Sequence, residues 1–449
     1  MPDEPAEPPA AQHLQEEPLP LRPNRPARGV VNRGERLSPH RPPPPVNDSS
    51  GRAIGAEEER LVLEVLRSGR LFRFVGDKVV ALEREFAKLM GVRYAVACSS
   101  GTAAIHAALA AVGVSPGDDV VTAPITDMGT VAPILFQGAV PMFADIDEDT
   151  YTVDPREVER CITERTAAIV PVHLFGFPAD MDPIMEAAEA RGVAVVEDCA
   201  QAYLAEYKGR LVGTIGHMGC FSLQQSKHMT AGEGGLVITN DPDLAQRAAL
   251  FTDKGWARWA SAHGLEPREY VMLGLNYRMT ELQGAVALAQ LPKLRWVVER
   301  RRELAEKLTR RLEGLDYVKP LPRIKGVKPS YWQYPVRVDV KALGVSLREF
   351  AEALRAEGIP CSAGYTGIPI YLARPLRERR VFAKTGFPLA DNPFYGRGVE
   401  YREGLCPRAE DALRHLLVIP WNEFYTPEDV NDIAEALEKL VRYYISARG

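Results

Sequence analysis

The stretch CFSLQQSKHMTAGEGGLVIT, residues 220–239, decides the fold prediction because it places one lysine, Lys227, between two apolar runs. These runs predict two buried strands, and the Gly-Glu-Gly-Gly turn between them permits close approach of the backbone. Burial lowers the pKa of a lysine below its reference value of about 10.4, and the neutral amine is the form that attacks a carbonyl to make an imine. We therefore take Lys227 as the candidate reacting residue. A lysine that ends a strand before a hairpin is the structural alternative.

The composition of the whole chain is that of a globular protein, and its length is sufficient for two domains. The chain has 449 residues, of which 46% are hydrophobic and 26% are charged. Its formal net charge of -5 argues against sequence-independent nucleic-acid binding, which needs a basic face. No apolar run reaches the roughly 20 residues of a membrane helix, and the first residues lack an apolar signal-peptide core. We expect a cytoplasmic protein without nucleic-acid or membrane partners.

The cysteines predict neither a metal site nor a disulfide framework. None of the six stands in a CxxC pair, and their scattered spacing is typical of reduced thiols in a cytoplasmic protein. They are Cys98, Cys161, Cys199, Cys220, Cys361 and Cys406.

Residues 1–50 predict a disordered tail. The segment is rich in proline and charge and includes the run Pro42 to Pro45. It cannot bury enough apolar surface to offset the entropy of ordering. A proline-rich ligand for a docking domain is the functional alternative.

Residues 51–290 alternate between apolar strands and amphipathic helices, which predicts an α/β domain whose sheet is mostly parallel and flanked by helices. The strand YAVACSS leads through Gly101 and Thr102 into the helix AAIHAALAAVGV. The first N–H groups of such a helix form an anion site, so Ser99, Ser100, Gly101 and Thr102 are candidates to cradle a phosphate. Serine and threonine are also ordinary N-caps.

Three polar residues follow apolar strands, namely Thr102, Asp127 and Asp198. Ligands of such sheets bind at the carboxyl ends of the strands, so we expect these residues to converge on one cleft. Asp198 is suited to hold a protonated ring nitrogen as an ion pair, and a helix cap or turn is its alternative role. Gln201 fits a hydrogen-bond partner or a capping residue equally well.

Residues 291–449 predict a linking helix and a smaller α/β domain. The linking helix, KLRWVVERRRELAEKLTRRLEGL, carries charges at three- and four-residue spacing, which predicts a solvated face that includes Arg300 to Arg302. The strand YWQYPVRVDV and helices at 347–357 and 427–444 follow. Tyr365, Tyr371 and Trp421 either reach the substrate or pack in the core.

The ordered motifs resemble a known family. A Gly-Thr turn, the acid in EDCAQAY and the lysine in SLQQSKHMTAGEGG occur in the order found in the DegT/DnrJ/EryC1/StrS family of pyridoxal-phosphate aminotransferases. VHLFGFPADMD, LNYRMTELQGAVALAQL and CPRAE extend the resemblance over about residues 61–440. It implies the fold type I architecture, in which a large domain with a mostly parallel seven-stranded sheet precedes a smaller C-terminal α/β domain.

The resemblance implies catalytic roles for two residues. Lys227 bonds covalently to pyridoxal 5'-phosphate as an imine and, once displaced by the donor amine, serves as the general base. Asp198 pairs with the pyridine nitrogen and keeps it protonated, while Gln201 lies near the phenolic oxygen of the ring.

It also implies a shared phosphate site. Gly101, Thr102 and Ser222 bind the phosphate, and Asn276 in the NYR motif completes the site of a neighbouring subunit. A homodimer with shared active sites follows. From the residues alone, Asn276 is only a plausible helix cap.

Two departures from the family pattern bear on the substrate. Ala202-Tyr203 replaces the Ala-His of many relatives. PITDMGT stands where the family has the residue that stacks on the cofactor ring, so we assign this stacking position to Asp127 or Met128. The loops APITDMGTVAPILFQG, QQSKHMTAGEGG and DKGW look most like glutamine:inosose aminotransferases. This resemblance implies a keto cyclitol acceptor with glutamine or glutamate as amino donor. A sugar-nucleotide aminotransferase, a pyridoxal-phosphate dehydratase and a non-catalytic cofactor-binding regulator are the alternatives.

Overall fold

The computed structural model describes residues 43–258, 268–396 and 398–447. Most of the predicted tail therefore lies outside the described residues, but residues 43–50 contact the folded body. The Asn422 side chain donates to the carbonyl of Pro44 at 2.5 Å, and the Gln225 side chain donates to that of Val46 at 3.2 Å. Contacts with the body thus begin before residue 51.

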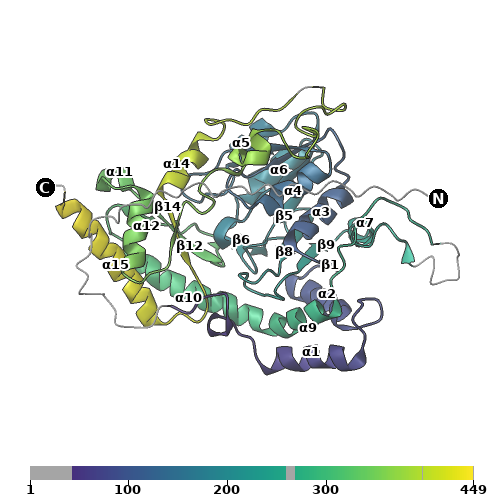
Figure 1. Cartoon of the computed structure of the whole chain (residues 1–449), viewed down its shortest axis with the longest axis horizontal. Coiled ribbons are helices and arrows are strands. Elements are labelled where there is room, and N and C mark those ends of the chain that lie inside the picture. Colours follow the sequence, from purple (N-terminus) through teal and green to yellow (C-terminus); the bar gives the residue numbers. More distant parts are fainter. Residues whose placement is uncertain (1–42, 259–267, 397, 448–449) are drawn as a thin grey trace, which may run out of the picture.

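A seven-stranded sheet forms the centre of the large domain (Figure 1). The pairs from β8 to β3 are parallel, whereas β9 is antiparallel to both of its neighbours, which confirms the mostly parallel sheet. In spatial order the strands are β1 Tyr94–Cys98, β9 Gly235–Thr239, β8 Met218–Ser222, β5 Ala194–Asp198, β4 Thr166–Val170, β2 Asp119–Thr122 and β3 Val140–Phe143.

Both faces of this sheet are covered by helices. Successive strand residues point to opposite faces, so Val195 belongs to one hydrophobic core and Val196 to the other. Near-continuous apolar strands are the sequence consequence of this double burial. The helices of the large domain are α1 Ala56–Ser68, α2 Lys78–Met90, α3 Gly101–Val112, α4 Met128–Phe136, α5 Pro155–Cys161, α6 Met181–Glu189, α7 Pro242–Thr252 and α9 Glu281–Gln290.

The smaller domain follows α10, Leu294–Leu312, which lies beside the terminal helix α15, Pro427–Ser446 (Figure 1). Its antiparallel sheet and its helices enclose a second hydrophobic core. The sheet contains β10 Val318–Pro320, β12 Gln333–Val338, β14 Leu416–Pro420 and β13 Ser362–Ala363, and the other helices are α11 Val340–Leu343, α12 Leu347–Ala356, α13 Arg374–Arg377 and α14 Pro407–His415. A three-stranded sheet of β11 Val327–Lys328, β6 Glu206–Tyr207 and β7 Arg210–Leu211 joins the two domains.

The part of the C-terminal region between residues 370 and 413 returns to the large domain. Its buried apolar residues belong to the same core as the large sheet. The Tyr395 hydroxyl donates to Asp119 at 2.8 Å, and the Tyr401 hydroxyl donates to the carbonyl of Pro141 at 2.7 Å. A single boundary at residue 290 therefore does not separate the two cores.

Helix α10 corrects the prediction of a solvated charged face. Arg300 does pair with Glu303 one turn away, at 2.7 Å. Arg301, however, is fully buried and forms an ion pair with Glu423 at 2.8 Å. The prediction was wrong for Arg301 because its position falls on the inward stripe of the helix, where a partner from a distant loop compensates the buried charge.

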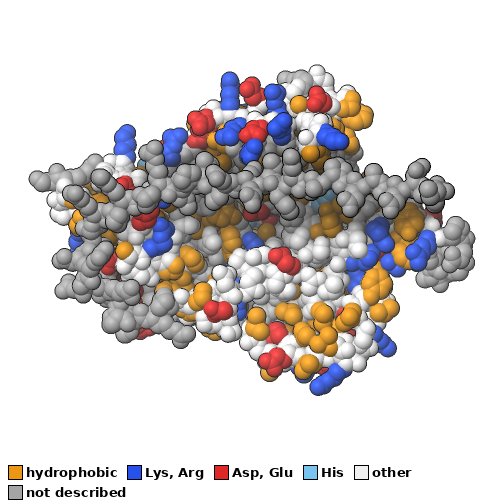
Figure 2. Space-filling model, viewed as in Figure 1, with side chains coloured by type: hydrophobic (Ala, Val, Ile, Leu, Met, Phe, Trp, Pro, Cys, Tyr) orange, Lys and Arg blue, Asp and Glu red, His pale blue; other side chains and the backbone are white. Residues whose placement is uncertain are grey.

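Exposed apolar side chains gather around the first two helices, where Figure 2 shows hydrophobic surface over the region of α1 and α9. On α1, Leu61 and Val65 face α9, whereas other apolar side chains face outward. Further exposed apolar side chains follow in the connection to α2 and at the start of α2. We call all of these exposed residues together the α1–α2 patch; it consists of Leu63, Leu66, Leu71, Phe72, Phe74, Val75 and Val80. Among the described residues, none of the helices combines the length and apolarity that a membrane crossing requires.

Candidate active site

Lys227 lies in the loop between β8 and β9, at the carboxyl end of β8. Its backbone N–H donates to the carbonyl of Gln224 at 2.9 Å, so the residue sits in a tight turn. Its amine lies 3.9 Å from the centre of the Trp332 ring, which belongs to the segment leading into β12. The aromatic face and the carboxyl edge of the large sheet therefore enclose the amine from two sides.

The surroundings of Lys227 favour the neutral amine. Burial lowers the pKa of this lysine to about 8, while the negative charges of Asp198 and Asp127 oppose the shift. At pH 7 roughly one amine in ten is then neutral, far more than for a lysine in water. This supports the prediction that Lys227 is the reacting residue.

We expect the cofactor-free protein to show this pKa directly. Because the reactive form is the neutral amine, acylation of Lys227 should rise with pH and reach half its maximal rate near pH 8. Lys208 is the internal control, since it also lies over an aromatic ring but is exposed, and its ion pair with Asp182 raises its pKa. Peptide mass spectrometry after brief acylation measures both sites. Equal pH profiles for the two lysines would contradict the assignment.

Asp198 ends β5 and is buried. One carboxylate oxygen accepts the N–H of Ala200 at 3.0 Å, and the other accepts the hydroxyl of Thr130 at 2.8 Å. Thr130 in turn bonds Thr126 at 2.6 Å. Burial raises the pKa of Asp198, whereas these donors and the cation of Lys227 lower it. Asp198 thus combines a turn role with a carboxylate directed toward the lysine site.

A saturated polar cluster beneath Asp198 fixes the end of β5. The Glu197 carboxylate accepts backbone N–H groups of three residues at 2.7 Å and lies 3.0 Å from His173 Nε2. His173 Nδ1 accepts the N–H of Ala179, so its other nitrogen carries the proton. Cys199 lies within reach of both side chains, and burial raises the pKa of its thiol. The protein itself supplies the partners of this cluster, so we assign it a structural role.

Gln201 links three segments at the site. Its side-chain oxygen accepts the N–H of Phe175 at 2.7 Å, and its nitrogen donates to the Tyr365 hydroxyl at 3.0 Å. Tyr365 also packs edge-on against Phe175 and Trp332. The side chain of Gln201 therefore forms hydrogen bonds that join the segments of the site, and it does not cap a helix.

Gly101 and Ser222 lie in contact at the start of α3. A Cβ atom at position 101 would stand 2.7 Å from Ser222 Cβ, so only glycine fits there. Ser100 caps the helix by accepting the N–H of Ala103, which leaves the N–H groups of Gly101 and Thr102 as the free donors of the first turn. This arrangement supplies the N–H donors that a phosphate requires.

Asp127 and Met128 stand at the start of α4. Asp127 is exposed and caps α4 by accepting the N–H of Gly129 at 2.7 Å. A Cβ at Gly129 would lie 2.7 Å from the Thr102 hydroxyl oxygen, so the start of α4 lies against the start of α3. Met128 is half-buried against the main core. The structure thus brings Thr102, Asp127 and Asp198 to one edge, as the strand-end argument predicts.

Asn276 lies on an exposed loop and forms an isolated β-bridge with Asp253. Of the three aromatic candidates for substrate contact, only Tyr365 reaches the site. Tyr371 is buried and donates to Glu410 at 2.5 Å, and Trp421 is buried and donates to the carbonyl of Arg301 at 3.0 Å. These two are core residues.

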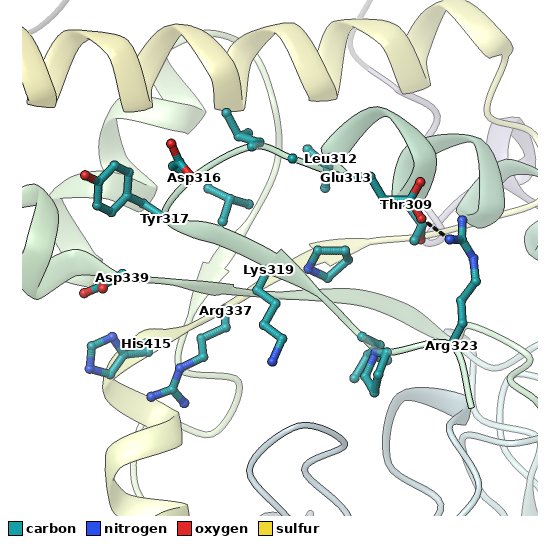
Figure 3. A pocket seen from close by; sticks show the side chains of 16 residues that line it. Thr309, Leu312, Glu313, Asp316, Tyr317, Lys319, Arg323, Arg337, Asp339 and His415 are labelled. Atoms are coloured by element: carbon teal, nitrogen blue, oxygen red, sulfur yellow. Dashed lines mark hydrogen bonds and ion pairs between the residues drawn. The ribbon is translucent and has the colours of Figure 1, made fainter. Parts of the chain in front are cut away.

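A hollow of about 660 Å³ lies in the small domain (Figure 3). Its basic side chains are already engaged: Arg323 pairs with Glu306, Lys319 with Asp149, and Arg337 with Asp411. The residues that line it fall between 309 and 415, and the predicted site residues are not among them. This hollow therefore does not contain the candidate site at Lys227.

Sequence reasoning missed three residues of the site: Thr130, Trp332 and Arg52, whose guanidinium donates to the carbonyl of Lys227. Thr130 stands three residues after Asp127, which is a helical-turn spacing that offered a signal. Trp332 was visible only as an aromatic in a predicted strand, and Arg52 carried no local signal at all.

Comparisons with known proteins find relatives that match most of the chain. The model of the DegT/DnrJ/EryC1/StrS aminotransferase family matches residues 52–392. The spore coat polysaccharide biosynthesis protein SpsC of Bacillus subtilis is 35% identical over 87% of this chain and 95% of its own. An aminotransferase from Psychrobacter cryohalolentis is 29% identical with a TM-score of 0.77, covering 87% of this chain and 97% of that one. DesV of S. venezuelae, solved in complex with a ketimine intermediate, is 29% identical with a TM-score of 0.75, covering 86% and 94%.

Proposed function

The chain belongs to the DegT/DnrJ/EryC1/StrS aminotransferase family, and we propose that it transfers an amino group from glutamine or glutamate to the ketone carbon of a polyhydroxylated ring, with pyridoxal 5'-phosphate as its cofactor. One observation carries the proposal. A lysine whose pKa is lowered to about 8 faces a buried carboxylate at the carboxyl edge of the large sheet. Family membership supplies the aminotransferase chemistry, and this pair supplies the site for it.

The residues fit the cofactor at each of its polar groups. Gly101, Thr102 and Ser222 would hold the phosphate at the start of α3, where the first N–H groups of the helix lie next to the Ser222 side chain. Asp198 would pair with the ring nitrogen, and Gln201 would lie near the phenolic oxygen. When bound, pyridoxal phosphate supplies the electron sink of the reaction.

The chain's own groups handle the proton. Lys227 anchors the cofactor and, when free, is the base that removes the proton from Cα of the amino donor. Its lowered pKa favours the neutral form that this role needs. Asp198 keeps a positive charge on its partner nitrogen, while Thr130 and Ala200 hold the carboxylate in place.

For the acceptor we propose a keto cyclitol, because the segments around Asp127, Lys227 and the DKGW sequence are similar to those of glutamine:inosose aminotransferases. A nucleotide-linked keto sugar is the second candidate. It is favoured by the similarity to SpsC, whose name assigns it to polysaccharide biosynthesis.

A two-stage assay tests the proposal. Glutamine or glutamate is expected to shift the absorbance of the reconstituted protein to that of the pyridoxamine form, and an added ketone should restore the original spectrum. Comparing scyllo-inosose with a nucleotide 4-keto sugar then decides the acceptor class. Restoration by the sugar nucleotide alone would overturn the cyclitol preference, and no shift with any donor would overturn the aminotransferase assignment.

We also propose that the active form is a homodimer. The α1–α2 patch exposes a run of apolar side chains that a second copy of the chain would cover. The loop that carries Asn276 is also apolar and exposed, with Leu273 at 90% exposure. A partner seated there would receive Asn276 at its phosphate site, as the family resemblance implies.

Introducing charge into the α1–α2 patch is expected to produce monomers. Val75→Glu would bury a carboxylate in an apolar contact, which costs enough to dissociate an ordinary interface. Light scattering coupled to size-exclusion chromatography measures the mass, and transamination should fall with it. Ile445→Glu on α15 is the matched control at similar exposure. A dimeric Val75→Glu variant would exclude the patch as the interface.

A further inference from the structure

Side chains from distant parts of the sequence hold three consecutive carbonyls of the lysine loop. The guanidinium of Arg52 donates to the carbonyl of Lys227 at 2.5 Å and to the carbonyl of Gln225. The indole N–H of Trp332 donates to the carbonyl between them, that of Ser226, at 2.9 Å. Arg52 and Trp332 thus both hold the backbone of residues 225–227.

Arg52 is committed to this task. It is only 2% exposed, and its third donor, Nε, bonds the carbonyl of Val46 at 3.0 Å. Its direct acceptors are backbone carbonyls and not carboxylates. Burial and the nearby Arg301 lower its pKa to about 10, and Glu423 partly opposes the shift. Keeping a cation in such surroundings is costly, and the planar guanidinium compensates by donating to three carbonyls at once.

Trp332 makes two contacts with the lysine loop. Its N–H bonds the loop, and its ring face lies 3.9 Å from the Lys227 amine. The two contacts require one orientation of the indole. A ring held in this way defines where the amine stands relative to the large sheet.

We propose that Arg52 and Trp332 form a clamp on residues 225–227 and are positioning residues that fix the place of the Lys227 amine. The proposal rests on the proposed function, since it concerns the same lysine. The clamp also assigns a role to the segment before α1, because Arg52 lies in that segment.

The test uses the full-length, cofactor-free protein. It is incubated with pyridoxal phosphate over a series of pH values and reduced with borohydride, and the tag is located by peptide mass spectrometry. The rate of tagging at Lys227 and its pH midpoint are the readouts. Burial sets this midpoint, and the charges of Asp198 and Asp127 oppose the shift. His228, the next residue, stays neutral because burial and the nearby cations Arg301, Arg52 and Lys227 lower its pKa.

Arg52→Lys and Trp332→Phe are the informative variants. Lysine keeps the buried charge without the planar donors, and phenylalanine keeps the ring face without the N–H. We expect tagging to slow by about tenfold to a hundredfold in each, since misplacing a reacting group by about an ångström has effects of this size. The midpoint should move upward as the loosened amine becomes hydrated.

Arg302→Lys is the matched control. Arg302 also donates to three backbone carbonyls, those of Pro329, Leu204 and Lys328, but away from the lysine loop. It should change the thermal midpoint of unfolding without changing the pH profile of tagging. Clamp variants that lose stability but keep the wild-type rate and midpoint would overturn the clamp. A wild-type protein tagged elsewhere than Lys227 would instead overturn the proposed function.

Discussion

Replacing Lys227 with alanine is expected to abolish turnover. The variant lacks both the amine that anchors the cofactor and the base that moves the proton, and general acid–base catalysis alone accounts for up to about 10⁴-fold in rate. Steady-state transamination and borohydride tagging are measured on the same preparation. Both signals should be lost together, because a single amine carries both roles.

Lys208→Ala separates this effect from the general loss of a lysine. Lys208 lies 4.9 Å from the centre of an aromatic ring, as Lys227 lies over Trp332, but on the surface. This variant should keep wild-type turnover and tagging at Lys227. Transamination that persists in Lys227→Ala would end the assignment of this residue.

Asp198→Asn is expected to lower turnover by about 10² to 10³-fold, the size of effect found when one preorganised electrostatic partner is removed. The amide keeps the shape of the side chain and can still accept the N–H of Ala200. It cannot carry the negative charge that the ring nitrogen needs. The fold should therefore survive while the chemistry fails.

A second readout has a defined sign. Because the charge of Asp198 raises the pKa of Lys227, its removal should move the acylation midpoint of the cofactor-free protein below about 8. Asp154→Asn is the matched control, since Asp154 is also buried and accepts the N–H two residues on, at 2.9 Å. It should affect stability and leave the midpoint in place. An unchanged midpoint in Asp198→Asn would show that the two groups do not interact.

The large domain was predictable because its signals are local. Apolar runs that alternate with amphipathic helices require a doubly covered sheet, and residues at strand ends meet at one edge. The contact of Gly101 with Ser222 and the convergence of Thr102, Asp127 and Asp198 both follow from this rule.

The features that sequence reasoning missed depend on long-range pairing. Arg301 is inward because Glu423, far along the chain, compensates its charge. Arg52 bonds backbone carbonyls, which every residue possesses, so its partners leave no trace in the pattern of side chains. Trp332 looks like a core aromatic until the fold brings Lys227 over its ring.

The return of residues 370–413 to the large domain affects the order in which the chain can mature. The core around the large sheet includes Tyr371, Leu389 and Leu413, which leave the ribosome after most of the chain has been made. The N-terminal residues are synthesised first, so part of their apolar surface stays exposed until residues 370–413 emerge. Exposed apolar surface favours aggregation and recruits chaperones. In a chain truncated after residue 290, this apolar surface would stay exposed.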